Sequence, residues 1–291
     1  AKRRLITTDA TDRAKSARSG DKLLPSLGIL LVTGGLLLLG WFAYLWFTPI
    51  PAPYQYQLIS EGDSKKFPQM DLDAWPDLKL SQYKVQAEGI DKPIAELIVA
   101  QQGDGPRVLT YWKNSTNEIL YNLDRKPSEL SALAAVIGKH APKDALILSW
   151  WDTSRQIKLL TGHDTLFTSH LNEPLMVPVA WLEQSKAIMA YENQFWESSA
   201  NSKEQEQFKR FSQALAASAE EGVAQLRELI GSNREAYLIV HVTDLYKLGL
   251  MYPDKIGVAY QNFPLTGNMH GMINHMKVQL KENDFNTYTL Q

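Results

Sequence analysis

The sequence contains no cysteine. This absence excludes disulfide bonds, thiolate metal sites, cysteine-ligated iron–sulfur clusters and the covalent attachment of a c-type haem through a CxxCH motif. A folded domain in this chain is therefore stabilised by its core alone. If the protein takes part in a redox pathway, it does not carry electrons through a c-type haem of its own.

The chain also lacks a large excess of positive or negative charge. The chain has 30 Lys and Arg residues against 32 Asp and Glu residues, and outside its N-terminal segment no basic patch indicates binding to nucleic acid. The nucleophile-elbow, P-loop, dinucleotide-binding and HExxH motifs are absent. His270 and His275 are spaced i, i+5 and so do not share a helix face. We therefore assign no catalytic residue, cofactor or metal ligand from the sequence.

One long hydrophobic run is present. It extends from Leu27 to Phe47 and contains 21 residues without a charged side chain. A helix of this length spans about 31 Å, which matches the hydrocarbon core of a bilayer. We predict a transmembrane helix over residues 23–48, with Trp41, Tyr44 and Trp46 at the membrane interface. The run is too long for the core of a cleavable signal peptide and no A-x-A site follows it, which favours a retained anchor.

Charges on the two sides of this run predict its orientation. Residues 1–22 form a basic tail with seven cationic side chains: Lys2, Arg3, Arg4, Arg13, Lys15, Arg18 and Lys22. The positive-inside rule places this tail in the cytoplasm and all that follows the span on the far side, which is the periplasm for a bacterial inner membrane. The Pro-containing stretch 49–85 is predicted to be a stalk that packs on the domain.

Residues 86–291 are predicted to form an extracytoplasmic α/β domain that begins with a small antiparallel meander. Three apolar segments, 94–100, 107–112 and 118–123, are separated by short turn-forming connections. Such spacing is typical of consecutive antiparallel strands.

Pro127 is suited to the first turn of a helix, which is predicted over 127–140. Beyond this helix the pattern alternates between buried strands and helices. The segments 145–150 and 237–242 are continuously apolar, and a short helical segment follows each of them. This alternation predicts a mainly parallel sheet. Between the two strands lies a long helical insertion, predicted over 179–196 and 202–230. An apolar segment at 256–260, a helix near 268–280 and an alternating segment at 285–290 complete the chain.

The most distinctive motif is Trp150-Trp151-Asp152, at the junction of the strand 145–150 and a helix predicted over 153–161, with Gly162 as its C-cap. In α/β sheets ligands usually bind at the carboxyl end of a strand beside a helix N-terminus. The motif, together with Arg155 and His163, is therefore a candidate contact site for a ligand or a partner. A purely structural role is equally consistent with the pattern: Asp152 or Thr153 would cap the helix, one tryptophan would be core and Arg155 would pair with Asp152.

The run from Ser149 to Gly162, SWWDTSRQIKLLTG, and the single N-terminal anchor resemble the HaoB family of membrane proteins, which is associated with hydroxylamine oxidoreductase in ammonia-oxidising bacteria. The resemblance covers most of the chain from the hydrophobic run onward. It implies a domain tethered to the inner membrane that acts with the hydroxylamine-oxidation machinery. It carries no catalytic residues over to this chain.

A fold-level resemblance links the same motif to the WWD-containing soluble domain of oligosaccharyltransferase catalytic subunits. In that family the motif contacts the acceptor peptide, so the resemblance implies a peptide contact at Trp150, Trp151 and Asp152. The usual Tyr-Gly after the aspartate is replaced by Thr153-Ser154. The multi-pass membrane portion is absent from this chain, which therefore cannot be such a transferase.

Two classes of function remain open. In the first, the protein is a non-catalytic, membrane-anchored accessory protein that recruits or scaffolds a multihaem hydroxylamine oxidoreductase or a membrane monooxygenase. Its tryptophans would supply contact anchors: Trp112, Trp150, Trp151, Trp181 and Trp196. In the second, it is a periplasmic ligand- or peptide-binding domain, either a sensor or an enzyme without a recognised motif. A pocket converging on Asp152, Arg155 and His163 would favour the second class.

Overall fold

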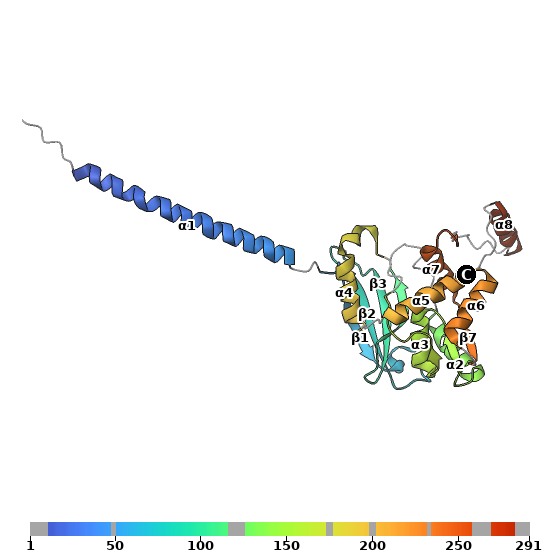
Figure 1. Cartoon of the computed structure of the whole chain (residues 1–291). Helices are drawn as coiled ribbons and strands as arrows, with labels where there is room; N and C mark the ends of the chain where they lie inside the picture. The colour runs from blue at the N-terminus through green and yellow to red at the C-terminus, as the bar shows by residue number, and fades with distance from the viewer. Residues whose placement is uncertain are drawn as a thin grey trace, which may run out of the picture. The chain divides into compact units, whose positions relative to one another are not determined.

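The computed structural model describes residues 11–47, 51–115, 126–172, 177–197, 202–231, 234–257 and 269–282. The chain divides into two compact units, residues 1–51 and residues 52–291. The first unit holds the helix α1 (Thr11–Phe47; Figure 1). Its segment Pro25–Phe47 has a mean hydropathy of 2.0 and, among the described residues, is the one helix long and apolar enough to cross a membrane. It is compatible with the predicted anchor over 23–48.

The three aromatic residues predicted at the membrane interface lie near the C-terminal end of α1. Their side chains are exposed, from 58% for Trp41 to 86% for Trp46, and the ring centroids of Trp41 and Tyr44 are 6.1 Å apart. Their placement at a lipid interface stays a prediction.

The second unit opens with a four-stranded antiparallel sheet in the order β1-β2-β3-β4. Its strands are β1 (Tyr54–Gly62), β2 (Leu78–Ala87), β3 (Ala95–Gln102) and β4 (Val108–Asn114). The last two strands match the predicted meander, while the predicted strand 118–123 lies outside the described residues. Most of the stretch predicted as a stalk over 49–85 instead forms β1, β2 and the short helices η1 (Ser64–Lys66) and η2 (Pro68–Met70) between them.

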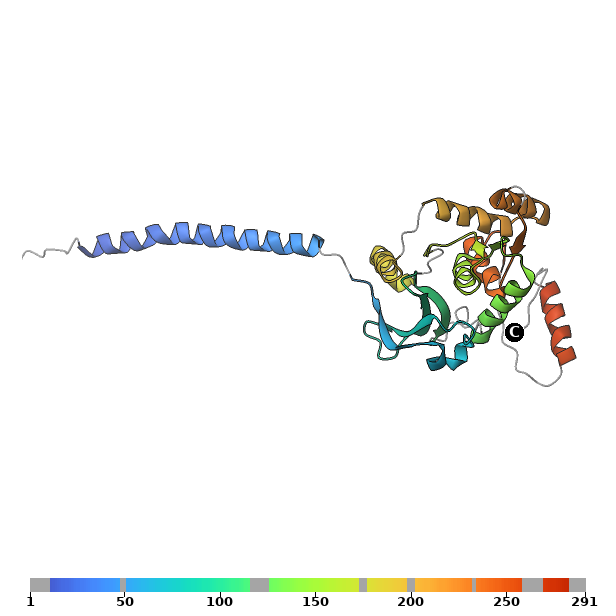
Figure 2. The same ribbon diagram turned by 90° about the horizontal axis from the view of Figure 1, so that it is seen from below.

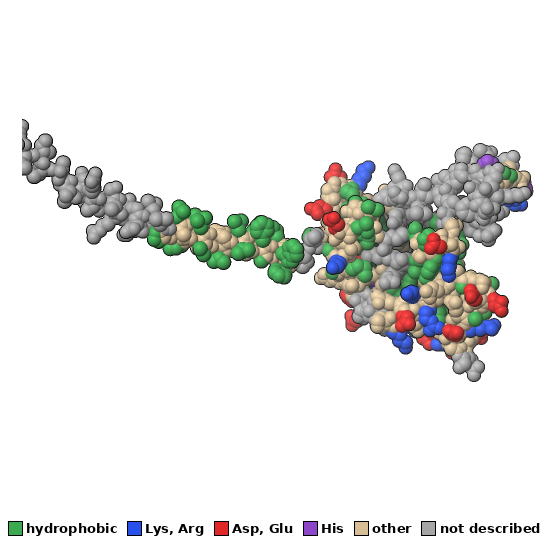
Figure 3. Space-filling model, turned by 45° about the horizontal axis from the view of Figure 1, so that its top comes forward, with side chains coloured by type: hydrophobic (Ala, Val, Ile, Leu, Met, Phe, Trp, Pro, Cys, Tyr) green, Lys and Arg blue, Asp and Glu red, His purple; other side chains and the backbone are tan. Residues whose placement is uncertain are grey.

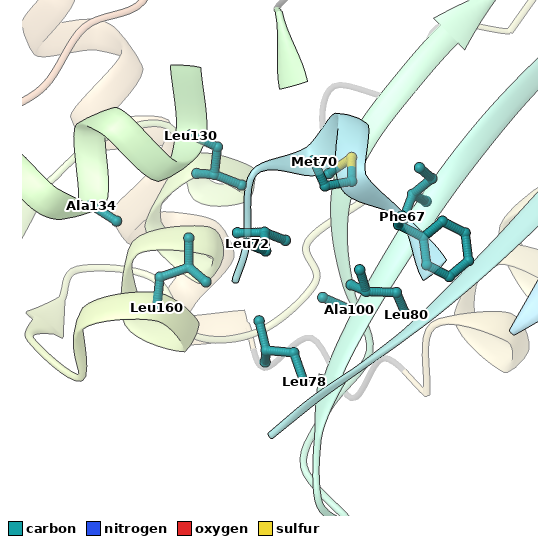
Figure 4. Close-up of a cluster of buried hydrophobic side chains, with 10 residues drawn as sticks. Phe67, Met70, Leu72, Leu78, Leu80, Ala100, Leu130, Ala134 and Leu160 are labelled. Carbon is teal, nitrogen blue, oxygen red and sulfur yellow. The ribbon is translucent and has the colours of Figure 1, made fainter. Parts of the chain in front are cut away.

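Both faces of this sheet are covered. On one face, the η1–η2 segment, β2 and β3 pack against α2 (Pro127–His140) and α3 (Trp151–Thr161) (Figure 4). The side chains in this cluster are nearly inaccessible to solvent, and they point toward one another from five segments: Phe67, Met70, Leu72, Leu78, Leu80, Ala100, Leu130, Ala134 and Leu160. The other face packs against η4 (Val179–Gln184) and α4 (Ser185–Phe195), as Figures 1 and 2 show for α4.

A second, smaller sheet is parallel and has the order β6-β5-β7. Its strands are short: β5 (Leu146–Leu148), β6 (Asp164–Thr165) and β7 (Ala236–Leu238). The prediction of a mainly parallel sheet is therefore wrong, because the larger sheet is antiparallel and the strands that were not predicted, β1 and β2, belong to it. The central strand β5 is fully buried, as its continuous apolar sequence predicts.

Helices α5 (Ser202–Leu215) and α6 (Ala219–Ile230) lie side by side (Figure 2). They replace the single helix predicted over 202–230, because Ser218 accepts a hydrogen bond from the Glu221 amide and starts a new helix. Gly222, in the first turn of α6, lies where a Cβ atom would approach the Ala214 carbonyl oxygen to 2.5 Å, so the close packing of α6 against the end of α5 needs a glycine.

The remaining helices are α7 (Val242–Met251), which follows β7 as predicted, and α8 (Met269–Glu282). Of the apolar segment 256–260, Ile256 and Gly257 form no strand and the other residues lie outside the described part of the chain, as does the alternating segment 285–290.

Helix α3 joins the two sheets by capping the free edge of β4. The Gln156 side-chain amide donates to the Leu109 carbonyl at 2.7 Å, and the Arg155 guanidinium donates to the Arg107 carbonyl at 2.6 Å. Two edge carbonyl groups are satisfied in this way, which protects the strand from pairing with another chain. The same helix follows β5 and so positions the Trp150-Trp151-Asp152 motif.

Candidate functional site

The two adjacent tryptophans of the motif occupy different environments. Trp150 is the N-cap residue of α3 and is 1% exposed. Its ring packs edge-to-face on Phe208 with centroids 5.0 Å apart, and the Lys247 Nζ atom lies 5.1 Å from its centroid. Trp150 is therefore a core residue, not an exposed anchor.

Trp151 is only partly buried and begins a stack of rings. Its ring meets that of His170 edge-on at 4.6 Å, and His170 in turn stacks on Trp196 at 4.7 Å with an angle of 15° between the planes. Trp196 is 3% exposed, so Trp151 is the part of this stack that solvent or a partner can reach.

Asp152 connects α3 to α7. One carboxylate oxygen accepts from the Thr153 amide at 2.6 Å, and the other lies 3.0 Å from the Lys247 Nζ atom. Lys247 also lies 3.5 Å from the buried Asp244 carboxylate in the first turn of α7. A carboxylate in the first turn of a helix is stabilised by the helix dipole. Asp152 is therefore paired with Lys247 across the two helices.

Arg155 points away from this pair into the interior. It is 4% exposed and donates to the His170 Nδ1 atom at 3.0 Å. Burial lowers the pKa of Arg155 to about 10, against the opposing influence of Asp152 and Glu204. Burial, and then the charge of Arg155, lowers the pKa of His170 to about 3. His170 is therefore neutral at physiological pH, and its Nδ1 accepts the hydrogen bond from Arg155.

His163 does not belong to this site. It follows Gly162, which ends α3 in the left-handed conformation that the sequence predicts for a helix C-cap. The eleven-residue helix separates it from Asp152 by about 16 Å along the axis. Its Nε2 atom lies 3.4 Å from the Ala141 carbonyl. The structure therefore does not bring Asp152, Arg155 and His163 together.

Three other residues at the carboxyl edge of the parallel sheet were not predicted from the sequence. His241 caps α7: its Nδ1 accepts from the Thr243 amide, and Asp244 accepts from the His241 amide. The His241 Nε2 atom lies 3.8 Å from the Glu129 carboxylate of α2. Both β5 and β7 were predicted as buried strands, and the carboxyl ends of parallel strands lie at one edge, so His241, Asp244 and Lys247 could have been placed beside Asp152.

A second polar cluster lies under α4 and was also missed. Glu192 is 5% exposed, and its carboxylate accepts hydrogen bonds from the Tyr54 hydroxyl, from the Tyr56 hydroxyl at 2.8 Å and from the Trp196 Nε1 atom at 2.7 Å. Burial and the nearby Glu192 carboxylate raise the pKa of both tyrosines. The cluster ties β1 to α4 through residues more than 130 positions apart in sequence.

The part of the chain that the structure describes contains no group of side chains that could bind a metal ion. There, no three His, Asp or Glu side chains converge as ligands. The site is instead a set of paired and capped charges at the carboxyl ends of β5, which is buried, and β7, which is partly exposed, with Trp151 and Lys247 at its solvent-facing side.

Comparisons with known proteins identify the family. Neither a curated protein nor a solved structure matches the chain. A protein family described as HaoA-associated protein HaoB matches it over residues 20–291, which include the SWWDTSRQIKLLTG run and nearly all of the chain. This confirms the resemblance found in the sequence, and the chain belongs to the HaoB family.

Proposed function

We propose that this protein is a membrane-anchored accessory protein that holds HaoA, the hydroxylamine oxidoreductase, at the periplasmic face of the inner membrane. The observation that carries the proposal is the family match, since the family is named for its association with HaoA and the match covers residues 20–291. The apolar helix Pro25–Phe47 supplies an anchor of suitable length. The basic tail that precedes it supports an orientation with the domain outside the cytoplasm.

The surface that fits a protein partner best is the solvent-facing side of the carboxyl edge of the parallel sheet. Here Trp151 and Lys247 are partly exposed, and Val240 and Leu250 are 46% and 47% exposed. We call these four residues the α7 surface. Aromatic residues are enriched at the centre of protein interfaces, and polar and charged side chains lie mainly at the rim. Trp150 and Trp196, which the sequence also suggested as anchors, are too buried to contact a partner.

The test is a titration of purified HaoA onto the full chain in lipid nanodiscs. We expect binding by the unmodified chain and at least tenfold weaker binding by Trp151→Ala and by Leu250→Asp, a loss of about 1.4 kcal/mol or more for each. Val136→Asp is the matched control, because Val136 is an exposed aliphatic residue on α2 (56% exposed) that is not part of the α7 surface. Circular dichroism would verify the fold of each variant.

The outcomes separate the two parts of the proposal. No binding of HaoA by the unmodified chain would overturn the accessory function. Binding that both α7-surface variants retain in full would overturn the location of the contact alone.

A further inference from the structure

One end of the antiparallel sheet lies close to the hydrophobic helix in sequence. β1 begins at Tyr54, and six residues separate it from Phe47, the last residue of α1. Even fully extended, this link spans at most about 25 Å. If α1 crosses a membrane, the end of the sheet that contains Tyr54 is therefore held within that distance of the end of the span.

Three other segments share this end of the sheet. Tyr54 is paired with Ala87, and the Glu88 amide donates to the Pro53 carbonyl at 2.9 Å, which places the β2–β3 turn here. Asn114 is paired with Ala95, so β4 ends here as well. Helix η4 completes the group, because the Trp181 ring lies 5.6 Å from that of Tyr54.

Each of these segments exposes an apolar side chain. Ile90 in the β2–β3 turn is 46% exposed, Trp112 near the end of β4 is 39% exposed, and Val179 and Leu182 on η4 are 85% and 54% exposed. Val179 and Leu182 are three residues apart and so lie on the same side of a 3-10 helix. We call these four residues the tether-end surface.

Charges around this surface are mixed. Lys92, Lys113 and Lys186 are exposed here, and so are Glu88, Asp91 and Glu183. Figure 3 shows the η4–α4 part of the domain with hydrophobic side chains among charges of both signs. A contact made by this surface is therefore carried by its apolar side chains and not by attraction of one charge sign.

We infer that the tether-end surface rests in the interfacial layer of the bilayer that α1 spans, with Val179 and Leu182 inserted among the lipid headgroups. The inference rests on the proposed anchoring. Apolar side chains gathered on one exposed face are a mark of membrane interaction sites, and tryptophan favours the membrane interface. A covalent link of this length keeps the local lipid concentration high, so a few apolar side chains suffice. This contact would fix the orientation of the domain and direct its remaining surface toward a partner.

The absence of cysteine makes a direct test possible, since any introduced cysteine is the single labelling site. Nitroxide labels would be attached to Val179→Cys and Leu182→Cys in the full chain, reconstituted in zwitterionic vesicles without HaoA. Val136→Cys is the control, an exposed valine on α2. Electron paramagnetic resonance would measure collisions of each label with oxygen, which concentrates in lipid, and with a water-soluble nickel chelate.

We expect the labels at 179 and 182 to collide severalfold more with oxygen and severalfold less with the nickel chelate than the label at 136. Equal accessibility at all three positions would overturn the inference. Protection of 179 and 182 that arises only after HaoA is added would also overturn it, in favour of a protein interface. The measurement is independent of HaoA binding, so failure of the proposed function and failure of this surface are distinguishable.

Discussion

The two sheets of the domain differ in how they are built. The antiparallel sheet has strands of seven to ten residues that follow one another in sequence, and clusters of buried side chains lie on both faces. The parallel sheet has strands of two or three residues, and β7 comes from a segment about 90 residues after β5. The first sheet has an extensive hydrogen-bonded ladder, while the second depends on helices and paired charges at its carboxyl edge.

One acidic side chain from each region shows the same contrast. Glu192, beside the antiparallel sheet, is satisfied by neutral donors from tyrosine and tryptophan. Asp152, at the edge of the parallel sheet, is partly exposed and paired with a lysine. We therefore expect substitutions in the Glu192 cluster to lower the stability of the fold. Substitutions at the solvent-facing edge of the parallel sheet should affect partner binding more than folding.

The largest expected difference in stability is between substitutions of the two adjacent tryptophans. Trp150→Ala removes a fully buried indole and should lower the free energy of unfolding by about 3–5 kcal/mol. Trp151→Ala, at the solvent-facing edge, should cost about 1 kcal/mol. Denaturant titration monitored by circular dichroism measures both. Equal losses for the two variants would show that Trp151 is as much a core residue as Trp150.

The Glu192 cluster should give the next largest effect. Glu192→Gln keeps the shape of the side chain but places an amide NH2 group where the carboxylate accepted hydrogen bonds, leaving a buried donor unpaired. We expect a loss of about 1–3 kcal/mol in the same titration. Glu183→Gln, at an exposed position of η4, is the matched control. If both variants were as stable as the unmodified chain, the cluster would contribute nothing to the fold.

The raised pKa of Tyr54 predicts a loss of stability at high pH. Above the ordinary tyrosine pKa of about 10, the unfolded chain releases the phenol proton while the folded chain retains it, so unfolding becomes more favourable as the pH rises. Tyr54→Phe should remove about 1.4 kcal/mol per pH unit from the slope of stability against pH in this range. Tyr83→Phe on the neighbouring strand is the control. Identical slopes for the unmodified chain and Tyr54→Phe would contradict the prediction.

The smallest expected effect is the coupling energy of the ion pair between Asp152 and Lys247, at the edge of the parallel sheet. A double-mutant cycle with Asp152→Asn and Lys247→Met should give a coupling of about 0.5–1 kcal/mol, reduced by salt. The Asp152 and Lys247 side chains are 21% and 24% exposed, whereas the Arg210 and Glu228 side chains are 47% and 69% exposed. The same cycle on Arg210 and Glu228 should therefore give less. A larger coupling for the exposed pair would reverse this ranking.

Local signals in the sequence predicted the elements around the candidate site. Pro127 marks the start of α2 and Gly162 the end of α3, and both helices have the predicted limits to within two residues. The strand β1 was missed because Leu58 and Ile59 are both exposed beside a bulge, which interrupts the alternation expected of a strand. The break between α5 and α6 could have been predicted, since Ser218 followed by Glu221 has the spacing of a capping box.

The polar contacts could not be predicted in this way. Tyr54 and Glu192 are 138 residues apart, and Asp152 and Lys247 are 95 apart, so only the packing of elements brings them together. The pairing of Arg155 with Asp152 was a reasonable expectation for residues one helical turn apart. Arg155 is instead buried, and its guanidinium donates hydrogen bonds to His170 and to the Arg107 carbonyl.

The most direct test of the accessory function is the distribution of HaoA between inner-membrane and soluble periplasmic fractions of the native bacterium. Cells with the full chain would be compared with cells that carry the chain without residues 11–47 and with cells that lack it. We predict that HaoA sediments with the membrane in the first case and moves to the soluble fraction in the other two. An unchanged distribution in all three would contradict the proposal that this protein holds HaoA at the membrane.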